Sequence, residues 1–485
     1  METFENYING QWTSSSTGET FQSLNPATEQ VIGEFQSSDK KDVEKSVKSA
    51  KKALKAWKTM PAPKRAEILF EAKNILKKRK DEFGRLVTQE MGKVLPEGLG
   101  DVQEAIDMCE LMAGEGRRLY GVTTPSELHE KFCMTIKAPI GVVGLITPWN
   151  FPFAIPSWKI APAMIAGNTM VFKPASYTPL CALRFVEVLE EAGVPPGVVN
   201  FVTGSGSAVG DPIVTSDVRA ISFTGSKEVG ESIKKKAGLK RVSLELGGKN
   251  PIVIMEDADL ELALDGVIWG AFGTTGQRCT AASRVIIHEE VHEEFMEMLL
   301  DRTEKLKLGD GLKESTDVGP LVSKKQQENV AADVEKAKKE SELLLGGSTT
   351  DVNGKGFFFE PTIFDEVTPK MYIAQKEFFG PVLAVMEIKD LSQAIEWANG
   401  IDYGLSSAIY TESMHNAFTA VRDLESGLTY VNSSTIGSEV HLPFGGVKDT
   451  GSTREGGIGA IEEFTEMKTV YFDYSGKLQK AQIDE

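Results

Sequence analysis

The chain has 485 residues, of which 41% are hydrophobic and 25% charged, and a formal net charge of −17. This length is too great for one hydrophobic core and predicts two to four domains of a soluble globular protein. Because the acidic sequence has no polybasic block and no apolar run of bilayer length, we expect neither nucleic acid nor a membrane as a partner.

The first residues, Met1–Tyr7, are acidic and lack the basic and apolar regions of a signal peptide, so a cytoplasmic location is expected. The four cysteines are far apart without a CxxC pair, and none of the five histidines has HExxH spacing. We therefore expect no disulfide framework, no zinc cluster and no metal catalysis.

Helix and strand patterns alternate along the first half of the chain. Val43, Val47 and Trp57 recur on one stripe of an expected helix, Asp39–Trp57. From about residue 140 to 255, short apolar runs alternate with amphipathic segments, which predicts a parallel sheet with both faces covered and a ligand at the strand ends. The expected strands are Gly141–Ile146, Thr169–Lys173, Val198–Val202, Ala220–Phe223 and Val242–Glu245, and the expected helices are Pro156–Ile165, Pro179–Ala192 and Lys227–Ala237.

A second alternating region runs from about residue 250 to 445. Two expected helices, Asp259–Phe272 and Glu289–Leu300, flank a glycine-punctuated loop that ends at Cys279 and leads into an expected strand, Arg284–His288. Loops held by rigid elements are common sites of catalytic groups. Cys279 stands in a polar turn beside Arg278, which favours a thiolate, whereas the alternative for a free cysteine is a small buried hydrophobe.

Glu245 ends an apolar strand that runs into two glycines. A carboxylate buried there has a raised pKa and suits a general base near neutral pH, while the alternative is a surface glutamate at a strand end. Asn150 directly follows another strand, where its amide is either an oxyanion-hole donor or part of a turn.

The segment Phe223–Gly230 lies between an expected strand and an expected helix. Its glycines permit the backbone to approach a diphosphate at the helix N-terminus. The spacing fits neither the GxGxxG fingerprint nor a P-loop, so the pattern alone is weak.

Together these segments resemble the aldehyde dehydrogenase superfamily, and the resemblance covers essentially the whole chain. Seven motifs occur in the family's order and spacing. They are Thr147–Pro152, Lys173–Ala175, Phe223–Gly230, Leu244–Lys249, Gly276–Cys279, Glu377–Pro381 and Pro443–Gly446.

The resemblance implies that an aldehyde is oxidised to an acid with NAD(P). Cys279 would be the nucleophile that forms a thioester, Glu245 the base that activates the hydrolytic water, and Asn150 with the Cys279 amide the oxyanion hole. Lys159 and Glu455 match positions of a proton relay, with a structural ion pair as the alternative reading. A CoA-acylating relative and a non-catalytic relative are the competing hypotheses, and both are disfavoured by the presence of Cys279 and Glu245.

The resemblance also implies a cofactor site. Lys173 would bind the adenosine ribose, Glu377 the nicotinamide ribose, and Ser226 with its helix the diphosphate. Ser176 stands where many NAD-preferring members have a glutamate, so NADP should be accepted, and a preference for NADP or NAD is left open. The other expected cofactor contacts are Ile146, Thr147, Pro148, Trp149, Gly206, Phe223, Gly225, Val229, Leu246, Gly247 and Phe379.

Phe151, Trp158 and Phe444 match aromatic positions of the family's aldehyde tunnel, and Thr280 is a further expected substrate contact. Arg278 occupies a position where an arginine anchors the distal acid of semialdehydes. The stretch 432–444 is similar to that of α-ketoglutarate-semialdehyde dehydrogenases. The expected substrate is an acidic semialdehyde, and the alternatives are broad aliphatic or aromatic aldehydes and pairing of Arg278 with a neighbouring acid.

The implied fold is α/β, with a Rossmann-like cofactor domain over 1–119 and 140–249 and an α/β catalytic domain over 250–445. A small β oligomerisation arm would combine 120–139 with 446–485, and it implies a homodimer or homotetramer. The segment Lys468–Tyr474 is an expected strand without a neighbouring strand in the sequence. It would belong to this arm, and its partner would lie elsewhere in the chain or in another subunit.

Overall fold

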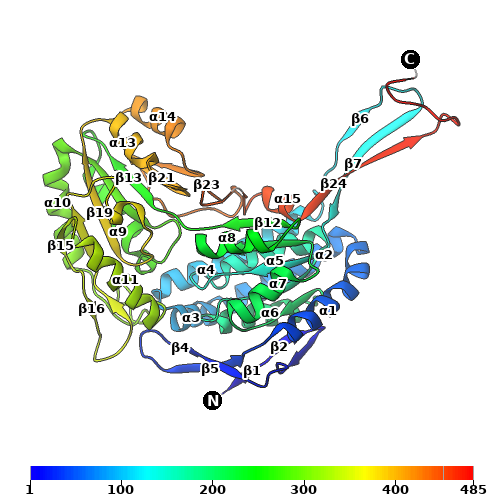
Figure 1. Cartoon of the computed structure of the whole chain (residues 1–485), viewed down its shortest axis with the longest axis horizontal. Coiled ribbons are helices and arrows are strands. Elements are labelled where there is room, and N and C mark those ends of the chain that lie inside the picture. Colours follow the sequence, from blue (N-terminus) through cyan, green and yellow to red (C-terminus); the bar gives the residue numbers. More distant parts are fainter. Residues whose placement is uncertain (1, 452, 484–485) are drawn as a thin grey trace.

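In the computed structural model, which describes residues 2–451 and 453–483, two seven-stranded sheets form two lobes and a β arm projects from one of them (Figure 1). The first sheet has the order β12-β11-β8-β9-β10-β2-β3, and its first five strands are parallel. These strands are β12 (Arg241–Glu245), β11 (Ala220–Thr224), β8 (Val142–Ile146), β9 (Thr169–Lys173) and β10 (Val199–Phe201), with the antiparallel hairpin β2 (Asn6–Ile8) and β3 (Gln11–Thr13) at the edge.

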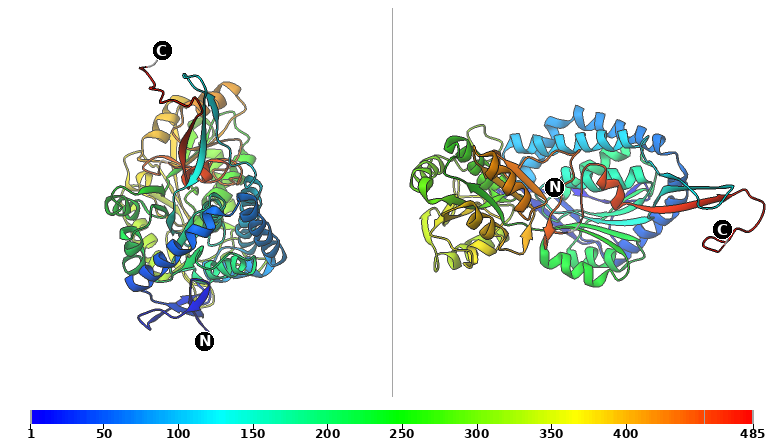
Figure 2. Two further views of the ribbon diagram at one scale, coloured as in Figure 1. Left: turned by 90° about the vertical axis from the view of Figure 1, so that its right-hand side faces the viewer. Right: turned by 90° about the horizontal axis from the view of Figure 1, so that it is seen from above.

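Helices cover both faces of this sheet because its strands are apolar on both sides, as expected for parallel strands (Figure 2). One face carries α2 (Ala62–Lys78), α3 (Lys80–Met91), α4 (Leu95–Glu115), α5 (Ala154–Ala166) and α6 (Pro179–Glu191). The other face carries α1 (Lys40–Thr59), α7 (Asp211–Thr215) and α8 (Lys227–Lys236).

The second sheet has the order β15-β18-β19-β14-β13-β21-β22 and is parallel except at β15. Its strands are β15 (Glu342–Leu345), β18 (Thr362–Asp365), β19 (Val382–Ile388), β14 (Ala282–His288), β13 (Asn250–Ile254), β21 (Ser406–Tyr410) and β22 (Leu428–Val431). Its helices are α9 (Leu260–Phe272) and α10 (Glu289–Glu304) on one face, and α11 (Lys324–Ala337), α13 (Leu391–Asn399) and α14 (Met414–Asp423) on the other.

The arm is a three-stranded antiparallel sheet of β24 (Thr465–Asp473), β7 (Lys131–Pro139) and β6 (Thr123–Pro125). It extends away from both lobes in Figure 1 and in the right-hand view of Figure 2. Short helices and small sheets complete the chain: α12 (Tyr372–Gln375), α15 (Gly459–Glu463), β1 (Thr3–Phe4), β4 (Thr20–Leu24), β5 (Val31–Gln36), β16 (Thr349–Thr350), β17 (Phe358–Phe359), β20 (Tyr403–Gly404) and β23 (Val447–Lys448).

The predicted elements are confirmed to within a few residues, apart from Glu289–Leu300, which extends to Glu304. Asp39 caps α1 by accepting from the Lys41 amide, and the predicted strand near the C-terminus pairs along its full length with β7 of the same chain. No helix within the described ranges is long and apolar enough to cross a bilayer.

Candidate functional site

A cavity of about 590 Å³ lies between the two lobes, where the carboxyl ends of the first sheet face the amino ends of the second. Segments that follow β8, β11 and β12 form one wall, as expected for the ligand-binding edge of a parallel sheet. Segments that precede β14 and β19 form the other. Of the predicted site residues, the cavity brings together Pro148, Trp149, Asn150, Gly225, Ser226, Leu246, Gly247, Cys279, Glu377 and Phe379.

The loop that carries Cys279 has a strained backbone. Thr274 and Thr275 have φ angles of 52° and 59°, in the left-handed region that β-branched residues avoid. Such conformations cost about 1–3 kcal/mol each and persist only where the surroundings impose them. Here the Gln277 side chain holds the loop in place. Its amide nitrogen donates to the Thr274 and Pro320 carbonyl oxygens, and its oxygen accepts from the Val322 amide.

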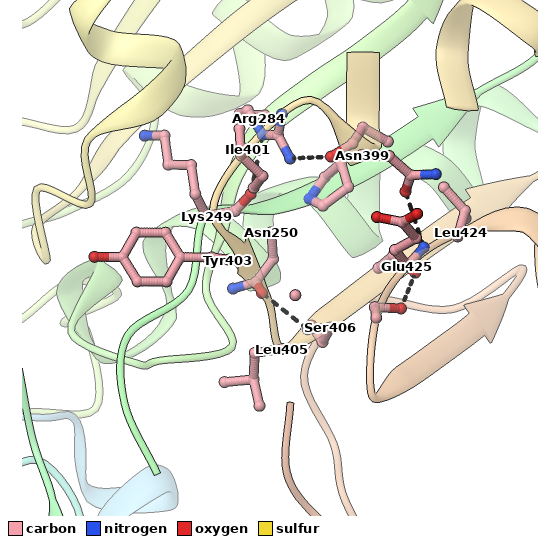
Figure 3. Close-up of a pocket in the computed structure, with 15 residues that line it drawn as sticks. Lys249, Asn250, Arg284, Asn399, Ile401, Tyr403, Leu405, Ser406, Leu424 and Glu425 are labelled. Carbon is pink, nitrogen blue, oxygen red and sulfur yellow. Dashed lines mark hydrogen bonds between the residues drawn. The ribbon is translucent and has the colours of Figure 1, made fainter. Parts of the chain in front are cut away.

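The chain directly after Cys279 is held by Asn250, the first residue of β13. Its amide nitrogen donates to the carbonyl oxygens of Cys279 (2.7 Å) and Ala281 (2.9 Å), and its oxygen accepts from the Ser406 amide. Figure 3 shows Asn250 and Ser406 beside a cavity of about 10 Å³ that Arg284 also lines. A space of this size holds at most one water molecule. The residues around it, Asn250 among them, therefore support the loop that carries Cys279.

The thiol of Cys279 faces the large cavity and is a free cysteine. Burial, followed by the negative charges of Glu377 and Glu245, raises the pKa of Cys279 to about 12. The resting side chain is therefore a neutral thiol at pH 7. Cys109, Cys133 and Cys181 are buried in α4, β7 and α6, away from this cavity.

Asn150 connects the two lobes at the nucleophile. Its amide nitrogen donates to the carbonyl oxygen of Gln277 over 3.1 Å, two residues before Cys279. Its side-chain oxygen is buried and has no hydrogen-bond partner within the described chain. The amide is thus oriented by the loop that carries the thiol.

Glu245 ends β12 and is 3% exposed. Its Oε1 atom accepts a hydrogen bond from the Thr453 hydroxyl, whereas Oε2 is buried without a partner among the described residues. Burial, and then the nearby Glu455 carboxylate, raise the pKa of Glu245 well above its ordinary value. A carboxyl with a raised pKa binds a proton more readily than an ordinary carboxylate, which suits a general base.

Lys159 and Glu455 form a buried ion pair, and the lysine also donates to the Ser222 hydroxyl over 2.9 Å. The Glu455 backbone pairs with Phe444 in an isolated bridge, which ties this pair to the segment that covers Glu245. The charges of both members act on Glu245, where Glu455 raises the pKa and Lys159 lowers it by a smaller amount.

Gly247 and Glu377 are packed against each other across the cavity. The Glu377 carboxylate accepts from the Gly248 amide over 3.1 Å, and burial raises its pKa to about 7. A Cβ atom on Gly247 would stand 2.1 Å from Glu377 Oε2, so a side chain there would displace this carboxylate. Trp149 of one wall and Phe379 of the other meet edge to face, with ring centroids 5.3 Å apart.

Ser226 caps α8 by accepting from the Val229 amide, which leaves the start of this ten-residue helix at the cavity edge beside Gly225. Phe223 lies in β11 beneath Gly225, and Val229 is exposed. Thr147 is buried directly behind Pro148.

A second group of predicted residues lies at the ends of β8, β9 and β10, outside the cavity lining. Lys173 is buried, donates to the Pro174 carbonyl oxygen, and has its pKa lowered by burial to about 8. The aliphatic part of the Lys173 side chain and Ile146 lie close to Gly210, the last residue of the helical turn Gly206–Gly210. Ser176 donates to the carbonyl oxygen of Gly204 over 3.1 Å.

Arg278 is engaged by Glu97 and by its own loop. Its Nη2 atom is 3.0 Å from Glu97 Oε1, its Nε atom donates to the Thr274 hydroxyl, and Phe151 and Trp269 flank the guanidinium. The predicted alternative of an ion pair with a neighbouring acid is therefore what the structure contains. Trp158 and Phe444 meet edge to face at 5.3 Å, and Thr280 is buried at the base of the loop.

Two residues beside the site were not predicted. Thr453 is 208 residues from Glu245 in sequence and Glu97 is 181 residues from Arg278, so no local pattern connects them. Further cavity residues that were not named as site residues include Thr224, Lys227, Lys376 and Tyr403. Thr224 and Lys227 lie within the predicted motif Phe223–Gly230, and Lys376 borders the predicted motif Glu377–Pro381. No group of three His, Cys, Asp or Glu side chains able to hold a metal ion occurs in residues 2–451 and 453–483.

Known proteins resemble this chain over nearly its whole length. The family model described as "Aldehyde dehydrogenase family" matches residues 12–470. The alpha-ketoglutaric semialdehyde dehydrogenase of Bacillus subtilis is 42% identical over 480 residues, covering 97% of this chain and 98% of the relative.

Solved structures are similar over nearly the whole chain. The betaine aldehyde dehydrogenase of Staphylococcus aureus in complex with NAD+ has a TM-score of 0.96 and 33% identity, with 98% of this chain and 96% of that chain covered. An NADP-dependent enzyme from E. coli has a TM-score of 0.94 and 37% identity, with 97% and 98% covered.

Proposed function

The chain belongs to the aldehyde dehydrogenase family and oxidises aldehydes with a nicotinamide cofactor, and on this premise we propose that Cys279 and Glu245 carry the reaction. The observation that supports the pair is their placement: a thiol at the cavity between the lobes and a buried, proton-accepting carboxyl whose charge affects that thiol. The product is a carboxylic acid.

Cys279 adds to the aldehyde carbon as a thiolate. Because burial keeps the resting thiol neutral, its proton must leave to solvent through the cavity before attack. The oxyanion that forms is stabilised by the Asn150 amide and the Cys279 backbone N–H, donors that are worth about 2.7–4 kcal/mol each in comparable sites. Loss of hydride from this adduct leaves a thioester on Cys279.

Glu245 then activates water for hydrolysis of the thioester. Its partnerless Oε2 atom is free to accept the proton of that water, while Thr453 holds Oε1. The Lys159–Glu455 pair is proposed to pass the proton onward, since it adjoins Glu245 and is itself buried. Hydrolysis by this base distinguishes the chain from a CoA-acylating relative.

The cavity residues fit a dinucleotide. The capped start of α8, Gly225 and Ser226 suit a diphosphate, and Glu377 suits a ribose hydroxyl beside the tight Gly247 cradle. Lys173 and Ser176, at the neighbouring strand ends, would hold the adenosine ribose. When bound, the cofactor accepts the hydride.

We also propose that NADP is accepted. Ser176 presents a hydroxyl where a carboxylate would repel a 2′-phosphate, and the nearby Lys173 is a cation to pair with one. An NADP-dependent structural relative and an NAD-bound one are both similar to this chain, which supports use of either cofactor.

The proposed substrate is an aldehyde with a distal carboxylate. Arg278 keeps N–H donors beyond those engaged by Glu97 and Thr274, because a guanidinium has five. The relative from B. subtilis that acts on a semialdehyde supports this choice. A broad aliphatic or aromatic specificity is the second candidate, favoured by the aromatic walls of Trp158 and Phe444.

We propose three domains. Residues 1–119 and 140–249 bind the cofactor, residues 250–445 carry catalysis, and residues 120–139 with 446–485 mediate oligomerisation. The arm supports a dimer or tetramer, because Phe132, Met467, Tyr471 and Phe472 are exposed apolar side chains on it. Residues of α15 pack against the first lobe and anchor the arm there.

The test of the nucleophile is Cys279→Ser, which should abolish dehydrogenase turnover and leave cofactor binding intact by fluorescence titration. Retained turnover would refute the assignment. Assays with and without CoA test the hydrolytic step, and strict dependence on CoA would overturn it. Profiles of kcat/KM over aliphatic, aromatic and ω-carboxy aldehydes, with NAD and with NADP, test the substrate and the cofactor.

A further inference from the structure

Glu97 lies in the first turn of α4, a helix of the first lobe, yet it bonds to the nucleophile loop of the second lobe. Its two carboxylate oxygens accept from the Thr274 amide over 2.8 and 3.1 Å. Its Oε1 atom also pairs with Arg278, directly before Cys279. Glu97 therefore contacts the loop at two points, Thr274 and Arg278.

Thr274, Glu97 and Arg278 form a closed set of contacts, because Arg278 Nε also donates to the Thr274 hydroxyl over 2.8 Å. Thr274 is one of the two threonines of this loop with a left-handed backbone, so the amide that Glu97 holds belongs to the strained part of the loop. A strained backbone keeps its form only while such contacts impose it. Both Glu97 and Arg278 have side chains only 12% exposed.

Asp101 stands one turn further along α4 and makes the matching contact in the first lobe. Its Oδ1 atom accepts from the amides of Phe153 (3.2 Å) and Ala154 (2.7 Å), in the segment that follows Asn150. Residues four apart project from the same face of a helix. One face of α4 thus holds the loop of Asn150 and the loop of Cys279 at a fixed spacing.

We propose that Glu97 is a positioning residue that sets the Cys279 thiol against the Asn150 amide by anchoring the strained nucleophile loop to α4. The inference rests on the proposed roles of Cys279 and Asn150. It adds a residue that touches neither aldehyde nor cofactor and acts through the loop. Misplacing a reacting group by about 1 Å can cost on the order of 100-fold in rate, so loss of this anchor should show mainly in kcat.

The test compares Glu97→Ala with Glu97→Gln. The glutamine keeps an oxygen that accepts from the Thr274 amide, whereas alanine removes it. We expect kcat to fall by about 100-fold in E97A and by less than about tenfold in E97Q. The dissociation constant of NAD(P) should change less than about twofold in both variants, because α4 does not line the cavity.

A second readout follows the thiol without turnover. Iodoacetamide should alkylate Cys279 at an altered rate in E97A and at a near wild-type rate in E97Q, with the labelled cysteine identified by peptide mapping. Glu110→Ala is the matched control, since Glu110 is exposed on the same helix and its ion-pair partner within the described residues is Lys73. It should leave kcat and alkylation unchanged.

Three outcomes would overturn the proposal: E97A with kcat within twofold of wild type, E97Q as impaired as E97A, or equal weakening of cofactor binding and kcat. If E97A does not fold, Glu97→Asp replaces it, because a side chain one methylene shorter loses the reach to the Thr274 amide. Failure of the nucleophile assignment would appear separately, as turnover that survives alkylation of Cys279 in the wild-type enzyme.

Discussion

The hydroxyl of Thr453 donates a hydrogen bond of 3.0 Å to the buried carboxylate of Glu245. This contact lowers the pKa of Glu245, against the larger effect of burial that raises it. A base must be ionised to act, so activity should rise with pH through the Glu245 pKa. Thr453→Val removes the donor, raises that pKa further, and should move the acid limb of the kcat profile to higher pH.

At pH 7 the loss in T453V should be on the order of tenfold, because hydrogen bonds to charged groups contribute about 1.5–3 kcal/mol. The measurement is kcat between pH 5.5 and 9. Thr453→Ser keeps the hydroxyl and serves as the control. An acid limb that stays in place, or one that moves equally in T453S, would show that Thr453 does not tune the base.

Glu245→Gln should separate the two halves of the reaction. Glutamine cannot take the proton of the hydrolytic water, so the thioester on Cys279 should accumulate. Stopped flow should then show a burst of reduced cofactor close to one equivalent, followed by turnover slowed by at least about 100-fold. Unchanged steady turnover without a burst would remove Glu245 from deacylation.

Gly247→Ala should weaken cofactor binding. The added Cβ would lie 2.1 Å from Glu377 Oε2 and must displace the carboxylate proposed to hold a ribose. We expect the KM for NAD(P) to rise by about tenfold or more, by analogy with the loss of one charged hydrogen bond. Gly238→Ala is a control on the surface, where a Cβ meets no atom within 4 Å, although its φ of +65° adds local strain. Equal KM values in G247A and wild type would show that close packing of Gly247 against Glu377 is not needed for cofactor binding.

Arg278→Gln tests the distal carboxylate. If the guanidinium binds that group, kcat/KM for ω-carboxy aldehydes should fall by about 10- to 100-fold, the range expected for a charged hydrogen bond. The kcat/KM for uncharged aldehydes of equal length should fall far less, and that smaller fall reports only the loss of the contact between Arg278 and Glu97. A uniform fall across both substrate classes would assign Arg278 to the loop and not to the substrate.

Local patterns in the sequence predicted the alternation of strands and helices and placed Asn150, Gly225 and Glu245 at strand ends. These predictions succeed because strand, helix and cap preferences depend on neighbours a few residues apart. The helix start at Asp39 and the strand end at Glu245 are examples.

Contacts between distant segments were outside the reach of such patterns. Glu97 reads as an ordinary acid at a helix start, where it complements the helix dipole, and only the packing of α4 against the second lobe brings it to Thr274. The same holds for Thr453 beside Glu245. Arg278 was expected to favour the thiolate, but a closer carboxylate engages it, and burial dominates the pKa of Cys279.

The pairing of β24 with β7 has a consequence for synthesis of the chain. β7 is made more than 300 residues before the strand that covers one of its edges. At translation rates of about 5–20 residues per second, that edge stays open for roughly tens of seconds. An unpaired edge is a template for wrong pairing, so nascent chains on crowded ribosomes are expected to need chaperone cover at this strand until β24 emerges.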